Sequence, residues 1–126
     1  MATRIWHLAT CNTCKRILSG LPDGIPLQDV RTQPLTEAQL DRMVELAGGV
    51  APLFSKRARK YRELGLHERQ PSDLELRALL LEHDTFLKRP VAIVSDGDPM
   101  DPKHAARIYI GSSKGVVTEL DKALNA

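Results

Sequence analysis

The sequence predicts a small α/β domain, because short strand patterns near both ends of the chain flank a middle section whose periodicity is helical. The pattern begins strand, helix, strand, and it ends strand, strand, helix. A length of 126 residues and a hydrophobic share of 42% suit one globular unit with a packed core. We therefore expect a single domain over residues 1–126, with the order β-α-β, an all-helical insertion, and β-β-α.

The first three predicted elements form a β-α-β unit. Residues 5–8 are short and partly alternating, which predicts a strand, and a helix over 13–19 follows with apolar side chains on one face. Residues 25–30 alternate apolar and polar side chains and predict a second strand, with Pro26 at its start or at a sheet edge. Two strands joined through a helix in this way are expected to have a right-handed crossover.

Two segments with the spacing of a capping box predict helix starts in the middle of the chain, at 36–39 and at 72–75. Apolar residues recur at helical spacing after each of them. Between these helices, residues 55–66 carry many cations and predict a short helix or a turn. We therefore expect an all-helical insertion from about 35 to 86.

Strand patterns return after the insertion. Residues 91–94 are a continuous apolar run, which is typical of a buried central strand. Residues 107–110 are predicted to pair with that strand, after a turn-rich connection that begins at 95–99. Apolar residues within 116–120 then suit a C-terminal helix.

Charge and hydropathy exclude several classes of protein. A formal charge of +2 is too small to imply direct nucleic-acid binding. No apolar run approaches the roughly 18–20 residues of a membrane span, and the first residues lack the apolar centre of a signal peptide. We expect a cytoplasmic protein without a membrane partner, in which a permanent structural disulfide is disfavoured.

Two cysteines, Cys11 and Cys14, lie three positions apart where the first predicted strand passes into the first helix. A sulfur at that place faces unpaired backbone N–H groups and the positive end of the helix dipole, and Lys15 and Arg16 add positive charge. Such surroundings lower a thiol pKa from about 8.5 into roughly the 3.5–7.5 range. We therefore predict that the Cys11 thiolate is the nucleophile and that Cys14, one turn later, resolves an adduct formed on Cys11.

Two other interpretations of the cysteine pair stay open. The spacing is also half of a zinc site, although the four histidines show no paired spacing and structural zinc requires four ligands. The cysteines could also pack as small apolar residues. We expect no metal at this site.

A strand, a CxxC motif and a helix in this order predict a thioredoxin-like fold. In that fold a cis proline usually precedes the central strand and faces the reactive cysteine. Arg89-Pro90 lies directly before the strand predicted at 91–94, so Pro90 is predicted to belong to the active-site loop. The alternative is a proline that only starts the strand, beside an arginine on the surface.

A dense cluster of cations lies at 56–62, with five Lys or Arg in seven residues. Such a run is usually a solvated helix face. Alternatively, one arginine turns toward Cys11 and holds an oxyanion with its forked guanidinium. Nucleic-acid binding is a third interpretation, weakened by the small net charge and by a single aromatic residue, Tyr61, in the run.

Three motifs carry a resemblance to one family. They are Cys11-Asn12-Thr13-Cys14-Lys15, the segment from Leu53-Phe54-Ser55-Lys56-Arg57 to Tyr61-Arg62-Glu63-Leu64-Gly65-Leu66, and Leu87-Lys88-Arg89-Pro90. In this order they are similar to the ArsC/Spx family, which contains glutaredoxin-coupled arsenate reductases, their uncharacterised relatives and the Spx redox regulators. The resemblance covers essentially the whole chain, including the helical insertion, and Ile110-Gly111 matches the last strand of the family.

The resemblance implies roles for several residues by position. Cys11 matches the catalytic thiol, Arg89 the arginine before the cis proline, and Arg57 the arginine of the insertion as Spx-like members place it. Thr13 and Lys15, within the CxxC motif and directly after it, are expected to help bind an anion.

The chain also departs from the arsenate reductases of this family. They carry the insertion arginine slightly earlier, where this chain has Ser55, and many have serine in place of Cys14. Their third arginine has no clear match, and Arg107, Lys103 and Lys114 are the alternatives for it.

The resemblance implies an enzyme that reduces a small oxyanion such as arsenate, or a disulfide, through the Cys11 thiolate, while Arg57 and Arg89 steady negative charge. It implies glutathione or glutaredoxin as the electron donor and no bound cofactor. The alternative is an Spx-like regulator in which the Cys11–Cys14 pair is a redox switch and the partner is RNA polymerase.

Overall fold

The computed structural model describes residues 2–125, which form two compact units. One unit is built from residues 2–33 and 89–125, and the other from Pro34–Lys88. Each is described below by itself.

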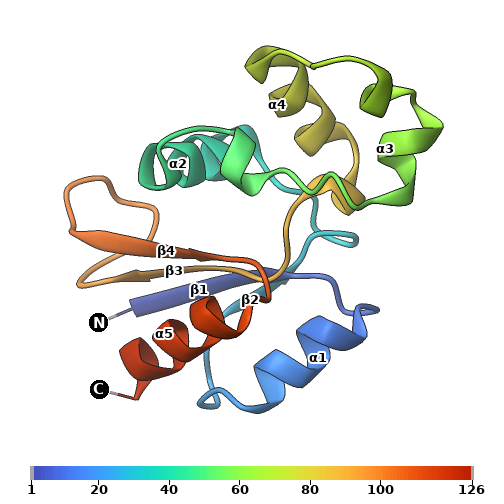
Figure 1. Cartoon of the computed structure of the whole chain (residues 1–126). Coiled ribbons are helices and arrows are strands. Elements are labelled where there is room, and N and C mark those ends of the chain that lie inside the picture. Colours follow the sequence, from blue (N-terminus) through green and yellow to red (C-terminus); the bar gives the residue numbers. More distant parts are fainter. Residues whose placement is uncertain (1, 126) are drawn as a thin grey trace. The chain divides into compact units, whose positions relative to one another are not determined.

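A four-stranded sheet organises the first unit (Figure 1). Its strands are β1 (Ala2–His7), β2 (Leu27–Asp29), β3 (Val91–Ser95) and β4 (Ala106–Ile110), in the spatial order β2-β1-β3-β4. β1 and β2 are parallel, whereas β3 is antiparallel to both β1 and β4. This β-α-β and β-β-α arrangement is the thioredoxin-like fold that the sequence predicts.

The register brings three chain segments together at one end of the sheet, where strands begin or finish. Trp6 lies opposite Val91, so the end of β1 is beside the start of β3. Val91 also lies opposite Ile110, so the end of β4 is there too. The segments that follow β1, precede β3 and follow β4 therefore lie at the same end of the sheet.

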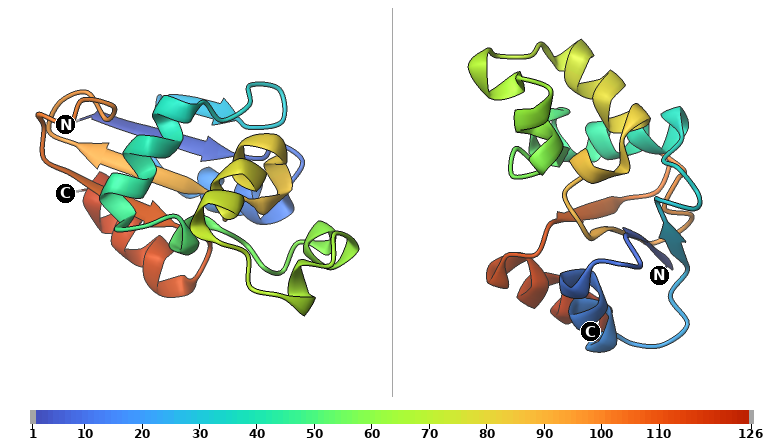
Figure 2. Two further views of the ribbon diagram at one scale, coloured as in Figure 1. Left: turned by 90° about the horizontal axis from the view of Figure 1, so that it is seen from above. Right: turned by 90° about the vertical axis from the view of Figure 1, so that its right-hand side faces the viewer.

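Two helices, α1 (Asn12–Ser19) and α5 (Lys114–Leu124), lie on the same face of the sheet, as Figure 1 and the right-hand view of Figure 2 show. Both are amphipathic and bury their apolar stripes, which removes that surface from water. The buried core on this face consists of Ile5, Ile17, Leu21, Ala92, Val94 and Leu120.

The second strand is shorter than the predicted 25–30, because Pro26 has no backbone N–H for the ladder. The flanking backbone still bonds to β1: the carbonyl of Pro26 accepts from Ile5 N–H at 3.1 Å, and Val30 N–H donates to the carbonyl of His7 at 2.9 Å. The pairing with β1 is therefore longer than the strand itself.

The second unit holds the helices α2 (Glu37–Ala47), α3 (Arg59–Glu63) and α4 (Asp73–Glu82). Three short 3₁₀ turns connect and extend them, at Ala51–Leu53, Leu66–Glu68 and Asp84–Phe86. The insertion predicted over about residues 35–86 lies within this unit. Across residues 2–125 no helix is both long enough and apolar enough to cross a lipid bilayer.

The two predicted capping boxes have different outcomes. At the start of α2, the Thr36 hydroxyl accepts from Gln39 N–H and the Gln39 side chain accepts from Thr36 N–H, both at 3.1 Å, so the box is complete. At the start of α4, Ser72 accepts from Glu75 N–H at 3.2 Å, but the Glu75 carboxylate binds the Arg69 guanidinium instead of turning back. The prediction of a full second box is wrong, because an ion pair competes for the carboxylate.

Aromatic rings form the centre of the second unit. Phe54 stacks on Phe86 with ring centroids 4.8 Å apart, and Tyr61 meets Phe54 edge-on at 6.1 Å. Phe54 and Leu87 form an isolated antiparallel bridge, which joins the two ends of the segment that contains α3 and α4. The apolar parts of two family-like motifs are thus core residues of this unit.

Candidate active site

Cys11 is the N-cap residue of α1, two turn residues and one core leucine after β1. Its backbone is extended, its N–H donates to the carbonyl of Leu8 at 2.9 Å, and its carbonyl accepts from Lys15 N–H at 3.0 Å. These two bonds hold the residue at the point where the chain enters the helix. The thiol is partly exposed, so a substrate can reach it.

The pKa of the Cys11 thiol lies below its ordinary value. Partial burial on its own raises this pKa, but donors to the sulfur outweigh it: the backbone N–H and thiol of Cys14, the N–H of Thr13 and the guanidinium of Arg89. Together with the helix dipole they favour a thiolate at this position.

Cys14 lies on the inner face of α1, and its side chain is 0% exposed. Burial raises the pKa of the Cys14 thiol most strongly, the backbone of Leu8 lowers it in part, and the contact with Cys11, to which Cys14 donates, raises it further. The two thiols therefore differ in kind. Cys11 is accessible and its thiol has a lowered pKa, whereas Cys14 is shielded and its thiol, which contacts Cys11, has a raised pKa.

The Arg89–Pro90 peptide bond is cis, as the sequence predicts. Pro90 is buried, and its carbonyl accepts from Gly111 N–H at 2.9 Å, which extends the pairing of β3 with β4 past the strand end. The Gly111 backbone has a φ of 90°, a conformation that glycine adopts without a steric cost. Arg89 donates to the Cys11 sulfur. The pairing of β1 with β3 places this arginine, which precedes β3, beside the thiol that follows β1.

The structure brings together most of the predicted site residues: Cys11, Cys14, Thr13, Arg89 and Pro90. Lys15 is exposed on α1 directly after the CxxC motif. Arg57 lies in the second unit, exposed in the turn before α3. Its part in the site stays a prediction.

The alternatives for a third basic residue occupy different ends of the first unit. Arg107 lies opposite Val94 on β4, and Lys103 lies in the loop between β3 and β4, both toward the sheet end away from Cys11. Lys114 opens α5 shortly after Ile110, at the end that carries Cys11. Of these three, only Lys114 is placed by the topology at the same end as the thiols.

The arrangement supplies the parts of a thiol-exchange or thiol-addition reaction. A thiolate can attack an electrophile, a guanidinium can hold negative charge beside it, and a second thiol lies one turn away. Within residues 2–125, no three His, Cys, Asp or Glu side chains gather in a way that could hold a metal ion.

Sequence reasoning did not single out the backbone of Leu8 or the amide of Gly111 as parts of this site. Leu8 bonds to both cysteines through its main chain, and Gly111 anchors the carbonyl of the cis proline. Main-chain groups leave no residue-type signal. The only available hint was a glycine directly after the last predicted strand.

Comparison with known proteins points in the same direction as this geometry. The sequence model of the ArsC family matches residues 6–112. An arsenate reductase of Yersinia enterocolitica is 27% identical over 97 residues, which cover 74% of this chain and 69% of that protein. An arsenate reductase of Rhizobium meliloti is 29% identical over 101 residues, which cover 77% and 72%.

The fold has counterparts among solved structures. A protein described as related to the ArsC family, from Bacteroides fragilis, superposes with a TM-score of 0.73 at 21% identity and covers 98% of each chain. This likeness shows the fold, and the family match spans both sequence motifs that contribute to the thiol site. The chain belongs to the ArsC family.

Proposed function

We propose that this protein is a thiol-dependent reductase of the arsenate reductase type, in which Cys11 is the catalytic nucleophile. The observation that carries the proposal is the contrast between the two thiols beside Arg89: one accessible with a lowered pKa, one buried with a raised pKa. The names of the relatives from Yersinia enterocolitica and Rhizobium meliloti support the same reaction class.

With arsenate as substrate, the Cys11 thiolate attacks arsenic, an S–As bond forms, and one As–OH oxygen takes a proton from solvent and leaves as water. A second thiol then attacks the Cys11 sulfur, an S–S bond forms, and the S–As bond breaks. Its electron pair stays on arsenic, which passes from As(V) to As(III). The Arg89 guanidinium would stabilise the negative charge of the oxyanion during the first step.

With a disulfide as substrate, the first step is thiol–disulfide exchange, and a mixed disulfide forms at Cys11. Cys14 can release either kind of adduct because it already contacts the Cys11 sulfur. External glutathione could do the same from solvent. Glutathione or glutaredoxin would then return the protein to its reduced form.

A coupled assay tests this function. The reduced protein is given arsenate, or a glutathione mixed disulfide, with glutathione, glutaredoxin, NADPH and glutathione reductase, and NADPH oxidation is followed. We expect turnover of at least one substrate by the wild type and none above background for Cys11→Ser. Turnover by Cys14→Ser at the wild-type rate would assign adduct release to glutathione, and its loss would assign release to Cys14.

Two outcomes would contradict the proposal. Equal turnover by wild type and Cys11→Ser would remove the thiol from the reaction. A protein that turns over neither substrate, yet forms a reversible Cys11–Cys14 disulfide under mild oxidation, would instead fit the regulator alternative.

A further inference from the structure

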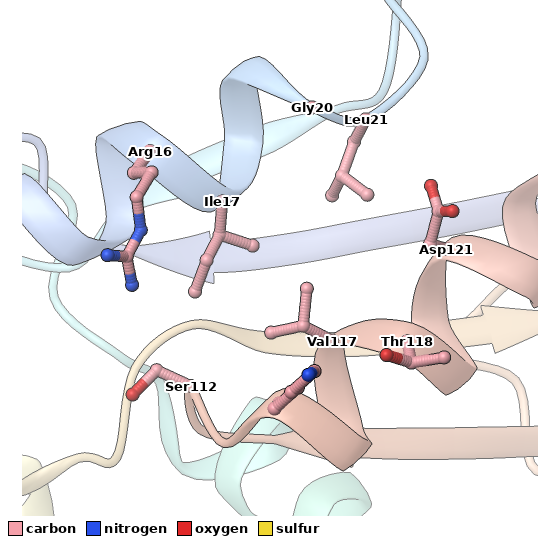
Figure 3. A pocket seen from close by; sticks show the side chains of 9 residues that line it. Arg16, Ile17, Gly20, Leu21, Ser112, Val117, Thr118 and Asp121 are labelled. Atoms are coloured by element: carbon pink, nitrogen blue, oxygen red, sulfur yellow. The ribbon is translucent and has the colours of Figure 1, made fainter.

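A groove runs between α1 and α5 on the outer surface of the first unit (Figure 3). Its volume is about 520 Å³, within the roughly 300–1,000 Å³ usual for small-molecule sites. The residues that line it include neither cysteine: Arg16, Ile17, Gly20, Leu21, Ser112, Lys114, Val117, Thr118 and Asp121.

One end of the groove is cationic. Arg16 points across it toward Ser112, and Lys114 lines it from the first turn of α5. Within the part of the chain that the structure describes, neither the Arg16 guanidinium nor the Lys114 ammonium has a hydrogen-bond or ion-pair partner. Two unpaired cations and a hydroxyl at one place form a complementary environment for a carboxylate.

The centre of the groove is apolar. Ile17 and Leu21 are buried members of the core, and Val117 is packed against that core from α5. Gly20 has no side chain to fill the space beside them. An apolar side chain placed here would contact Ile17 and Val117, which face each other in Figure 3.

The other end is acidic. Thr118 and Asp121 line it, and Oδ1 of the Asp121 carboxylate accepts a hydrogen bond from the Asn125 amide at 2.8 Å. Asp121 lies seven positions after Lys114 on the same helix, so the two charged ends are separated by about 10 Å along its axis. An extended chain of three residues has about this length, at roughly 3.3–3.6 Å per residue.

We propose that this groove binds a zwitterionic peptide of about three residues with an apolar central side chain. Its carboxylate lies at Arg16, Lys114 and Ser112, its middle lies on Ile17 and Val117, and its ammonium lies at Asp121 and Thr118. The opposite charges at the two ends set the orientation. Neither cysteine lines the groove, so its occupation needs no sulfur in the ligand and no redox step.

The probe is the tripeptide Ala-Val-Ala with free ends, titrated into the ¹⁵N-labelled full chain and followed through the backbone amide shifts of α1 and α5. Its N-acetylated and C-amidated forms each lack one charge. We expect the free peptide to bind and each blocked form to bind about three- to tenfold more weakly. No saturable shift in α1 and α5, or equal affinity of all three peptides, would overturn the proposal.

Two variants assign the ends. Arg16→Gln should weaken the free peptide about threefold or more but leave the C-amidated form unchanged, and Asp121→Asn should do the same toward the N-acetylated form. Arg107→Gln, on β4 and outside the groove, is the matched control and should change nothing. Cys11→Ser should bind the free peptide as the wild type does, which separates this result from the proposed reductase function. Variants that weaken all three peptides alike would contradict the proposed orientation.

Discussion

At the start of α1, two thiols one helical turn apart have pKa values that are shifted in opposite directions. Cys11 is accessible and has a lowered pKa, whereas Cys14 is buried and has a raised pKa. The difference follows from position: the N-cap faces the unpaired N–H groups of the helix, and the next turn faces the core. A single helix thus supplies both an accessible thiol of lowered pKa and a buried thiol of raised pKa.

This contrast predicts selective alkylation. At about pH 6, with limiting iodoacetamide, Cys11 of the reduced protein should be modified at least about tenfold faster than Cys14, because the thiolate reacts and the thiol does not. Peptide mapping by mass spectrometry identifies the modified residue. Equal labelling, or labelling mainly at Cys14, would remove the role assigned to Cys11.

The contact between Arg89 and the Cys11 sulfur makes a second prediction. Removing a donor to the thiolate raises the pKa of Cys11, so Arg89→Ala should slow alkylation at neutral pH. The wild type and Arg89→Ala should react at similar rates once the pH is above the Cys11 pKa of both proteins. Rates measured across pH test the sign, and Arg107→Ala is the control arginine on β4. A uniform loss at every pH would indicate a structural defect instead.

The accessible thiol of Cys11 and the arginine beside it could be located from sequence because both lie in short local motifs, CxxC and Arg-Pro. The lowered pKa of Cys11 was predicted from its place at a helix start, but the causes of the two shifts could not be read from sequence. They are the burial of each sulfur, the contact between the two cysteines, the Thr13 and Leu8 main chain and the Arg89 guanidinium, which reaches Cys11 through the pairing of β1 with β3.

Among the elements, the basic run around α3 contains Arg57, whose predicted role in binding the substrate is open to a direct test. Arg57 and Lys56 lie in a turn, and Arg59 begins the helix itself. Both arginines are exposed within the second unit, so neither is part of its core.

Substitution of these two arginines tests the role that the family resemblance implies for Arg57. If Arg57 binds the charged substrate, Arg57→Ala should lower turnover in the coupled assay by about 10²–10³-fold, while Arg59→Ala should change it little. The free energy of unfolding should be unchanged in both variants. Small and similar effects would mean that the run is a solvated surface.

Capping motifs predicted where the helices begin, but the side-chain bonds of a motif formed only where no other residue bound the same side chain. The Thr36 box is complete because the Gln39 side chain turns back to the Thr36 N–H, whereas Glu75 at the second box pairs with Arg69, an arginine outside the four-residue motif. The same limit applies to β2, where the alternating pattern is longer than the strand that Pro26 permits. Local patterns predict which element forms, and contacts beyond them decide its details.

At the scale of the whole molecule, stability of the first unit depends on the face where α1 and α5 cover the sheet. Leu120 on α5 is 2% exposed and packs among core residues from β1, β3 and α1. Leu120→Ala should therefore lower the free energy of unfolding by about 2–5 kcal/mol. Leu74, 78% exposed on α4, is the matched control, and Leu74→Ala should change stability by less than about 0.5 kcal/mol. Denaturant titrations compare the two, and equal effects would contradict this account of the core.

The order of elements and the thioredoxin-like fold could be predicted, because strand and helix periods differ and the β-α-β connection has few topological solutions. The extent of the second unit was also close to the predicted helical insertion, but the sequence did not predict that this insertion forms a compact unit of its own. No composition change marks a boundary at Pro34 or Lys88, and the second unit is closed by contacts between distant residues, such as the Phe54–Leu87 bridge and the stacking of Phe54 on Phe86.

Because the two thiols have different pKa values, oxidation to a disulfide would also change the net charge of this protein. Between the two pKa values, the reduced pair carries one negative charge and one proton, and a Cys11–Cys14 disulfide carries neither. Oxidation would therefore release a single proton, make the chain one charge more positive and leave the Arg89 guanidinium without its anion. Isoelectric focusing would then separate the two redox forms by charge alone.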